Sequence, residues 1–447
     1  MDNVTHGLAG LLVADAASHW LARRGRAVEP RVRRALSVLG IVAAEFPDSD
    51  LVYSGPVLHM GPLGYLLHHR GHTHTIVWAV ASAVGLWLVA RWWVRRGSVE
   101  GGSLHGGSLH GGSLKGGSTT GMSLVSRTML AVALIGTLSH LLLDWTNSYG
   151  VHPFWPFDGR WFYGDAVFIV EPWLWLVAIP ALYFHRPSRT GRVLLPLLFV
   201  LILAAVALLG QVARDVAMLL FVFAVVWPLA QWRLGAVART LTGVAAWTLV
   251  TLGFFATSQR AEAAVRASVQ RVGVMRGTAD TVRLLDVVLN PGPGDWGCWS
   301  ALVMSTRGDR YDVSTAFVAP LPFRSLATCE AGYRTGRLGT DVLAALPSRT
   351  AATFGNTAQV RWRSSWQAPR EALATLARTR CEVDAALHFM RAPVWQPAGT
   401  DQLLLSDARF GVGGGGFSEA LVPARGPCSL TRPWIPDWVP PRADLLD

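Results

Sequence analysis

The sequence predicts a mainly α-helical protein: a polytopic bundle of membrane helices followed by a β-rich extramembrane domain at the C-terminus. Three observations support this fold class. The chain has 447 residues, 51% of them hydrophobic and only 15% charged, whereas soluble domains contain about 25% charged residues. Long apolar stretches fill residues 1–258. From residue 259 onward the pattern changes to short alternating runs separated by Gly, Pro and Asp, which is typical of strands and turns.

Residues 1–258 are expected to contain about six to eight membrane helices, because a helix needs roughly 20 apolar residues to cross the hydrocarbon core. Six stretches approach or reach that length, and two shorter apolar helices precede them. Glu171 and Pro172 lie inside one stretch and predict an irregular first turn there. The six stretches are 75–94, 124–143, 166–184, 193–213, 216–232 and 240–258, and the shorter helices are 5–22 and 35–46.

The placement of arginine orients this predicted bundle. Arginine-rich ends face the cytoplasm, so eight alternating segments put both termini on the outer side of a bacterial-type inner membrane. The opposite ends carry only Arg70, Arg160 and Arg214. The net charge of +11 therefore reflects membrane anchoring, and no nucleic-acid partner is expected. The arginine-rich segments are 23–34, 91–96, 186–192 and 233–239.

Two further regions complete the predicted organisation. Residues 97–121 repeat Gly, Ser, Leu and His, and they are expected to form a flexible linker on the cytoplasmic side. Residues 259–447 form the β-rich domain, of the α+β type, on the outer side. The expected strands and helices of this domain are a helical lead at Ala261–Val274, strands at Thr281–Leu289, Trp299–Ser305, Val360–Arg363 and Gln402–Leu405, and an amphipathic helix at Pro369–Arg380.

All the cysteines follow the last long apolar stretch. They are widely spaced and match no zinc-binding pattern. One or two disulfides are expected if the domain lies outside the cytoplasm, and buried thiols are the alternative. The four residues are Cys298, Cys329, Cys381 and Cys428.

Two histidine clusters lie at outer ends of the predicted helices. His140 and Asp144 are four residues apart on a predicted helix and therefore share a face. This spacing is a natural half-site for a metal, although helix packing would also explain it. His69, His72 and His74 lie just before the span that starts near residue 75. A metal site is favoured here over a polar cluster at the membrane surface, since neutral imidazole is a common metal ligand.

Acidic residues accompany these histidines on the same side. Asp48 and Asp50 follow Pro47 at the end of a short helix, where they either bind metal or merely terminate the helix. His6 is a weak candidate alone, because Asp2 or Thr5 nearby could simply cap the first helix.

A second polar group lies between the predicted spans. Acids at a helix N-terminus are electrostatically favourable, so Asp165 and Glu171 have a structural explanation, with a supporting role at a metal site as the alternative. His152 and Arg160 lie in the same region and could meet an anionic substrate, or could simply be solvated.

The clusters as a set resemble a known family, the YdjM-like membrane-bound metal-dependent hydrolases. This chain departs from the family pattern at Glu171, where the family usually has Asp, and at His72, which falls at a free position of the pattern. The matching stretches are Met1–His6, Pro47–Asp50, His69–His74, His140–Asp144, Asn147–Gly150 and Arg160–Trp175, with weaker similarity at Asn290–Pro293 and Asp407–Phe410. The family is distantly similar to zinc-dependent phospholipase C, which implies hydrolysis of a phosphoester.

The resemblance implies a metal-dependent hydrolase in which metal-activated water attacks an ester, plausibly a phosphoester. One to three divalent ions are expected, with zinc favoured, and the substrate would be a small molecule, a membrane lipid or a lipid-linked intermediate. The expected metal ligands are His6, Asp48, Asp50, His69, His74, His140 and Asp144. The candidate catalytic residues are Asp48, Asp50, His69, Arg70, His72 and Asn147.

Non-enzymatic functions form the alternative. A transporter could use the same residues for ion coupling, but it would need polar residues near the middle of the membrane, and stretches 193–213 and 240–258 contain almost none. An assembly or receptor protein could use a structural metal and present its C-terminal domain to a protein partner that the sequence does not identify. No His-Glu-x-x-His and no Gly-x-Ser-x-Gly motif is present, which disfavours zinc proteases and serine hydrolases.

Overall fold

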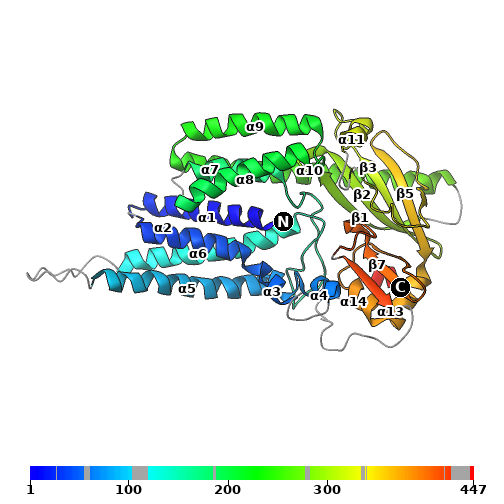
Figure 1. The fold of residues 1–447 in the computed structure, drawn as a ribbon, viewed down its shortest axis with the longest axis horizontal. Helices are drawn as coiled ribbons and strands as arrows, with labels where there is room; N and C mark the ends of the chain where they lie inside the picture. The colour runs from blue at the N-terminus through cyan, green and yellow to red at the C-terminus, as the bar shows by residue number, and fades with distance from the viewer. Residues whose placement is uncertain are drawn as a thin grey trace, which may run out of the picture.

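The protein consists of a helical bundle with two antiparallel sheets at one end (Figure 1). The N-terminus lies where the bundle meets the sheets. This arrangement confirms the predicted fold class. The computed structural model describes residues 1–26, 28–54, 61–102, 119–184, 188–276, 282–333, 338, 340–416, 418–423 and 443–446.

Eight longer helices build the bundle. Five of them, among the described residues, contain stretches long and apolar enough to cross a membrane: Ile76–Arg96, Leu124–Trp145, Arg189–Leu208, Arg214–Arg233 and Ala236–Arg271. The eight helices are α1 (Asn3–Arg23), α2 (Pro30–Glu45), α5 (Ile76–Gly102), α6 (Thr119–Trp145), α7 (Pro172–Tyr183), α8 (Arg189–Leu208), α9 (Arg214–Arg233) and α10 (Ala236–Arg276). Short helices α3 (Asp50–Ser54) and α4 (Gly61–His68) and the 3-10 turns η1 (Phe46–Ser49) and η2 (His72–His74) connect α2 to α5.

Three expected boundaries differ from the structure. The expected span 166–184 contains only the 12 residues of α7, whose first residue is Pro172, and the helix is buried within the bundle. The expected division after residue 258 falls inside α10, which is continuous over 41 residues because no proline interrupts it. The expected linker 97–121 is shorter at both ends, since α5 continues to Gly102 and α6 begins at Thr119, and its middle lies outside the described residues.

Helices α1, α2 and α6 approach so closely that their backbones touch. A Cβ atom added to Gly10 of α1 would lie 2.2 Å from the carbonyl oxygen of Gly40 in α2. A Cβ added to Gly136 of α6 would lie 2.8 Å from the Cβ of Ala43 in α2. Small residues permit such contacts between membrane helices. This packing fixes the positions of His6, Glu45 and His140 relative to one another, because each lies about one helical turn from a contact.

Replacing Gly10 by alanine is expected to destabilise the bundle, although alanine is the better helix former. The added methyl group has no space, and overpacking of this kind costs roughly 1–3 kcal/mol. Gly85→Ala in α5 is the matched control, because no atom lies within 4 Å of a Cβ added there. Thermal unfolding in detergent measures both variants. Equal melting temperatures for Gly10→Ala and Gly85→Ala would contradict the close helix contact.

Among the residues that the structure describes, eight strands form the two sheets of the C-terminal part. The larger sheet has the order β1-β2-β3-β5-β4 and the smaller has the order β6-β7-β8. Each expected strand is present, and the expected helix Pro369–Arg380 is α13 (Arg370–Thr379), with Pro369 at its N-cap position. The strands are β1 (Val282–Gly292), β2 (Asp295–Arg307), β3 (Arg310–Val318), β4 (Thr350–Ala351), β5 (Val360–Pro369), β6 (Pro393–Pro397), β7 (Gln402–Asp407) and β8 (Glu419–Pro423), with helices α11 (Leu326–Gly332), α14 (Cys381–Leu387) and α15 (Ala443–Leu446) and the 3-10 turn η3 (Ala408–Phe410).

The expected disulfides are present. Cys298 of β2 is bonded to Cys329 of α11, and Cys381 is also disulfide-bonded. Cys428 lies outside the described residues. The prediction of disulfides rather than buried thiols is therefore confirmed for the described cysteines.

The turn between β1 and β2 attaches the sheets to the bundle. The Trp173 indole N–H donates to the carbonyl of Gly294 over 2.9 Å, and the Gly294 N–H donates to Glu171 over 3.2 Å. Arg324 bridges Asp295, the first residue of β2, and Asp215 in the first turn of α9. The C-terminal domain is thus connected to the bundle by buried hydrogen bonds as well as by the backbone of α10.

Candidate metal centre

The predicted site residues come from four separate segments that meet at the sheet-facing end of the bundle. Helix α1 supplies His6, turn η1 supplies Asp48, turn η2 supplies His74, and the last two turns of α6 supply His140 and Asp144. The side chains of His6, His74 and His140 are fully buried. The convergence predicted from the sequence is present in the structure.

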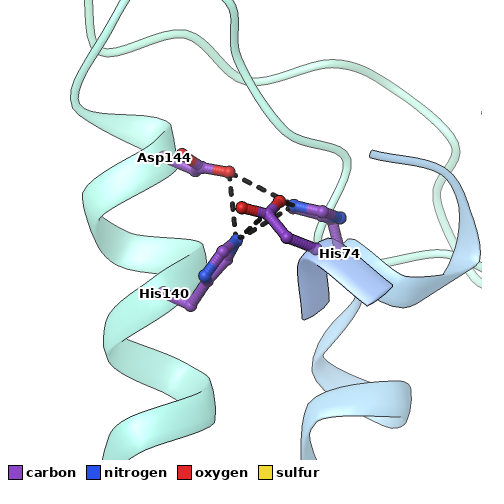
Figure 2. Close-up of side chains that lie close together, drawn as sticks. His74, His140 and Asp144 are labelled. Carbon is purple, nitrogen blue, oxygen red and sulfur yellow. Dashed lines mark hydrogen bonds and ion pairs between the residues drawn. The ribbon is translucent and has the colours of Figure 1, made fainter. Parts of the chain in front are cut away.

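His140 and Asp144 lie one turn apart and point to the same side of α6 (Figure 2). The Nε2 atom of His140 is 3.3 Å from Oδ2 of Asp144. Its Nδ1 atom lies 2.6 Å from the carbonyl oxygen of Ala44, which accepts the Nδ1 proton. This hydrogen bond leaves Nε2 with its lone pair facing the site, the arrangement of a metal-binding histidine.

His74, in turn η2, faces His140 and Asp144 from across the site (Figure 2). Its Nε2 atom is 3.1 Å from Nε2 of His140 and 3.2 Å from Oδ2 of Asp144. Two imidazole nitrogens bound to one tetrahedral zinc ion would be about 3.3 Å apart, given Zn–N distances of roughly 2.0–2.1 Å. The observed separation therefore matches two ligands of a single ion.

Asp48 completes a first group of four ligands. Its Oδ1 atom is 3.3 Å from Nε2 of His74 and 3.4 Å from Nε2 of His140. Asp48 also belongs to a second group, with Asp50 and His69. In each group the ligand atoms lie within 4.8 Å of one another. Asp48 is consequently the residue that could contact two ions.

Asp50 accepts hydrogen bonds from the histidine-rich segment, residues 69–74. Its Oδ2 atom accepts hydrogen bonds from the Arg70 backbone N–H and the Thr73 hydroxyl, each over 2.8 Å. Nδ1 of His69 lies 3.1 Å from Oδ1, and Nδ1 of His74 lies 3.3 Å from Oδ2. Asp50 therefore orients His74 and His69, whether or not it also touches an ion.

His6 lies beside the first group. Its ring stacks on that of His140 with centroids 3.8 Å apart, and its Nε2 atom is 3.3 Å from Oδ1 of Asp144. Within the described part of the chain, neither ring nitrogen of this buried side chain makes a hydrogen bond, and Oδ2 of Asp144 makes none either. Buried polar atoms that make no hydrogen bond are costly. Together with the His and Asp donor set, they fit a bound divalent cation.

The electrostatics of the centre favour a cation. Burial alone would lower the pKa of His74, but the carboxylates of Asp144, Asp48 and Asp50 raise it to about 10. Burial alone would likewise raise the pKa of Asp48, but the neighbouring imidazole rings of His140 and His74 hold this pKa well below its usual range. The carboxylates thus remain ionised and stabilise positive charge between them.

Arg70 and Tyr149 cover one side of the centre. The Nη2 atom of Arg70 donates to Oδ1 of Asp144 over 2.7 Å, and its Nη1 atom donates to the carbonyl of Gly150 over 2.9 Å. The guanidinium lies 4.1 Å from the centroid of the Tyr149 ring. The backbone amine of Met1 also contacts Asp144. Arg70, predicted as a catalytic residue, therefore lies against the ligand group, and its contacts indicate that it orients Asp144.

Other candidates lie outside the two ligand groups. The His72 ring is half-buried and packs against Trp78, with ring centroids 5.4 Å apart. Asn147 accepts a hydrogen bond from the Tyr149 N–H over 2.8 Å and so stabilises the turn after α6. The His152 ring lies 2.7 Å from the Arg70 carbonyl, and burial lowers the pKa of His152 to about 4.

The remaining acids and Arg160 make structural contacts. Arg160 pairs with Asp158 on the surface, and Asp165 pairs with Arg391 of the C-terminal domain over 2.8 Å. Glu171 caps α7 and accepts from the Trp173 N–H. The structural interpretation of acids at this helix start therefore agrees with the contacts of Glu171.

Glu171 should make stability depend on pH. Burial raises its pKa to about 8, despite two backbone N–H donors, whereas its value in an unfolded chain is about 4.3. The folded state consequently holds a proton that the unfolded state releases, and stability falls as pH rises between those two values. The melting temperature of the wild type should fall from pH 5 to pH 8 relative to that of Glu171→Gln. Parallel curves would contradict the prediction.

The sequence alone does not identify some of the groups that support the site. The Ala44 carbonyl, which orients His140, has no sequence signature. Arg409 of η3 donates to the carbonyls of Ser148 and Tyr149 over 2.8 and 3.1 Å and so holds the turn after α6. In the sequence, the weak similarity to the family at Asp407–Phe410 is the one feature that points to Arg409 and its neighbours.

A comparison with known protein families matches the first part of the bundle, where the candidate ligands lie. Residues 1–213 match the YdjM inner membrane protein family, and the match covers every ligand of both groups. No curated protein and no solved structure matches the chain. The part of the bundle that holds the buried His and Asp cluster, within residues 1–213, is therefore similar to the YdjM inner membrane protein family.

Proposed function

We propose that this protein is a membrane-bound metal-dependent hydrolase. The observation that carries the proposal is the buried convergence of Asp48, His74, His140 and Asp144, with His6 against them. Zinc is the favoured metal, because its ligands are typically His and Asp in groups of three or four. Asp50 and His69, with Asp48 shared, would hold a second ion.

The chemistry follows from the metal and from the residues around it. A divalent ion held here would lower the pKa of a water molecule and polarise the ester bond. Asp50 keeps His69 and His74 oriented, and Arg70 keeps Asp144 in place. The site lies at the end of the membrane helices, beside the lipid headgroups. A phosphoester of a lipid or lipid-linked molecule is the substrate class that this position favours.

The proposed orientation puts the metal centre and the C-terminal domain outside the cytoplasm. Arginine-rich helix ends lie at the other end of the bundle, as the charge rule requires of cytoplasmic ends. The disulfides of Cys298 and Cys381 support the same orientation, since disulfides are rare in the reducing cytoplasm. Maleimide labelling of single cysteines introduced at Asp401 and Arg189, in intact cells, would test it.

Zinc-loaded protein in detergent should hydrolyse a chromogenic phosphodiester or a phospholipid. Treatment with a chelator should abolish turnover, and added zinc should restore it. His140→Ala should show no metal-dependent turnover. If the zinc-loaded wild type and the chelated protein release product at the same background rate from both substrates, the hydrolase proposal is wrong.

A structural metal site is the second candidate. The ligands His74, His140 and Asp144 are at most 1% exposed, and structural metals are typically enclosed by protein ligands. In that case chelation would lower the melting temperature sharply, as expected when metal binding supplies folding energy, and no substrate would be turned over before or after it. An assembly or receptor function would then account for the C-terminal domain.

A further inference from the structure

A long groove opens on the side of the bundle, between α1, α6 and α10. Its volume is about 970 Å³. Its apolar walls include Ala16, Ala131, Val244 and Trp247. The parts of α6 and α10 that line it belong to the candidate membrane spans. The groove is therefore open to the hydrocarbon core of a bilayer.

One end of the groove is basic. Arg23 and Arg24 at the end of α1 and Arg127 near the start of α6 lie there, and all three are exposed. Arg24 lies over the Trp20 ring, 5.2 Å from its centroid. Over the part of the chain that the structure describes, no carboxylate comes within ion-pair distance of these three arginines.

The acidic residue of α1 that is closest in sequence to Arg23 and Arg24 does not neutralise the basic end of the groove. Asp15 is paired with His19, with Nε2 and Oδ2 3.5 Å apart, and it also accepts a hydrogen bond from Thr240. The three guanidinium groups thus form a positive cluster at the mouth of an apolar groove. The end of α1 and the start of α6, which carry these arginines, lie at the end of the bundle away from the sheets (Figure 1).

The dimensions suit one kind of occupant. From Ala9 to Arg24 the groove follows α1 and its C-cap over 16 residues, or about 22 Å at a rise of 1.5 Å per step. This is more than half of the roughly 30 Å thickness of the hydrocarbon core. An acyl chain would fill the apolar length, and a phosphate would meet the arginines, which bind phosphate with several donors.

We propose that this groove binds one anionic phospholipid from the leaflet at the arginine-rich ends of the helices. The acyl chains lie along α1 between α6 and α10, and the phosphate lies among Arg23, Arg24 and Arg127. This lipid is distinct from any substrate, because its headgroup is at the opposite end of α1 from His6. The site depends on neither hydrolysis nor metal.

Native mass spectrometry of the full-length protein in detergent, titrated with phosphatidylglycerol and phosphatidylcholine, tests the proposal. Phosphatidylglycerol should bind tightly and phosphatidylcholine weakly. The variant Arg23→Gln/Arg24→Gln/Arg127→Gln should lose affinity for phosphatidylglycerol by on the order of a hundredfold, at roughly fivefold for each arginine near the headgroups. The matched control Arg189→Gln/Arg192→Gln/Arg233→Gln removes three exposed arginines from the same side and should bind like the wild type.

A second variant separates binding from folding. Ala131→Trp fills the groove, leaves every arginine in place and should also weaken phosphatidylglycerol binding. The metal content of each variant reports whether the distant centre is still folded. Equal binding of the two lipids by the wild type, equal loss in the two triple variants, or unchanged binding by Ala131→Trp would each overturn the proposal.

Discussion

His140→Ala is expected to empty the metal centre while the bundle stays folded. His140 is a neutral ligand when Nδ1–H donates to the Ala44 carbonyl, so its removal strands no buried charge. Loss of a partner that merely orients a ligand lowers metal affinity by 10–100-fold in other proteins, and loss of the ligand should exceed that range. Elemental analysis after extensive dialysis measures the bound metal, and thermal unfolding measures the fold.

The comparison with Asp144→Ala sharpens this test. Asp144 compensates Arg70 and the Met1 amine, and removing one partner of a buried ion pair costs roughly 3–5 kcal/mol. Asp144→Ala should therefore lose both metal and stability, whereas His140→Ala should lose mainly metal.

His72→Ala is the matched control for a histidine of the same region. Its ring faces Trp78 and belongs to neither ligand group, so the variant should retain its metal. If His140→Ala keeps a full complement of metal, or His72→Ala loses as much as His140→Ala does, the ligand assignment is wrong.

Much of this centre could be predicted from local sequence rules. The spacing of His140 and Asp144 places them on one helix face whatever surrounds them. The charge rule puts the ends of different helices on the same side of the membrane. Both rules act over a single helix or a single span. They therefore identified residues that the structure brings together from separate segments.

The distinction among ligand, orienting residue and bystander could not be predicted in this way. His72 and His74 are two residues apart in the same turn, yet only His74 faces α6. Arg70, just before this turn, has a left-handed backbone conformation with a φ of 59°. Such a conformation is uncommon for a residue with a side chain, and no local pattern at this position indicates it.

The bounds of the membrane spans could not be predicted exactly from local sequence rules either. Apolar length alone does not distinguish a helix that faces lipid from one surrounded by other helices. Helix α7 is apolar because all eleven of its residues from Pro172 to Leu182 are buried by the protein itself. The continuation of α10 past residue 258 shows that a change from apolar to polar composition can occur without a break in the helix.

Arg409→Met is expected to loosen the C-terminal domain from the metal centre. The Arg409 side chain is 1% exposed and donates to Asp407, which is fully buried. Breaking such a pair costs roughly 3–5 kcal/mol because it strands the remaining charge. The melting temperature should fall by on the order of 10 °C.

Two comparisons make this prediction specific. Arg361→Met removes an arginine whose pair with Glu330 is 42% and 48% exposed, and exposed pairs contribute about 1 kcal/mol or less. Combining Arg409→Met with Asp407→Asn removes the stranded charge and should recover part of the loss. The buried-pair argument fails if Arg409→Met melts like Arg361→Met, or if the double variant is less stable than Arg409→Met alone.

Arg409→Met should also reduce turnover without removing metal. Arg409 touches none of the ligands, but it holds the carbonyls of Ser148 and Tyr149. The Tyr149 ring lies against the Arg70 guanidinium and, with centroids 5.6 Å apart, against His69. A looser turn would leave Arg70 and His69 less well oriented while His74, His140 and Asp144 remained in place. Full metal content with a lower kcat would assign the C-terminal domain a part in the reaction, whereas loss of metal would show that the domain holds the ligands themselves.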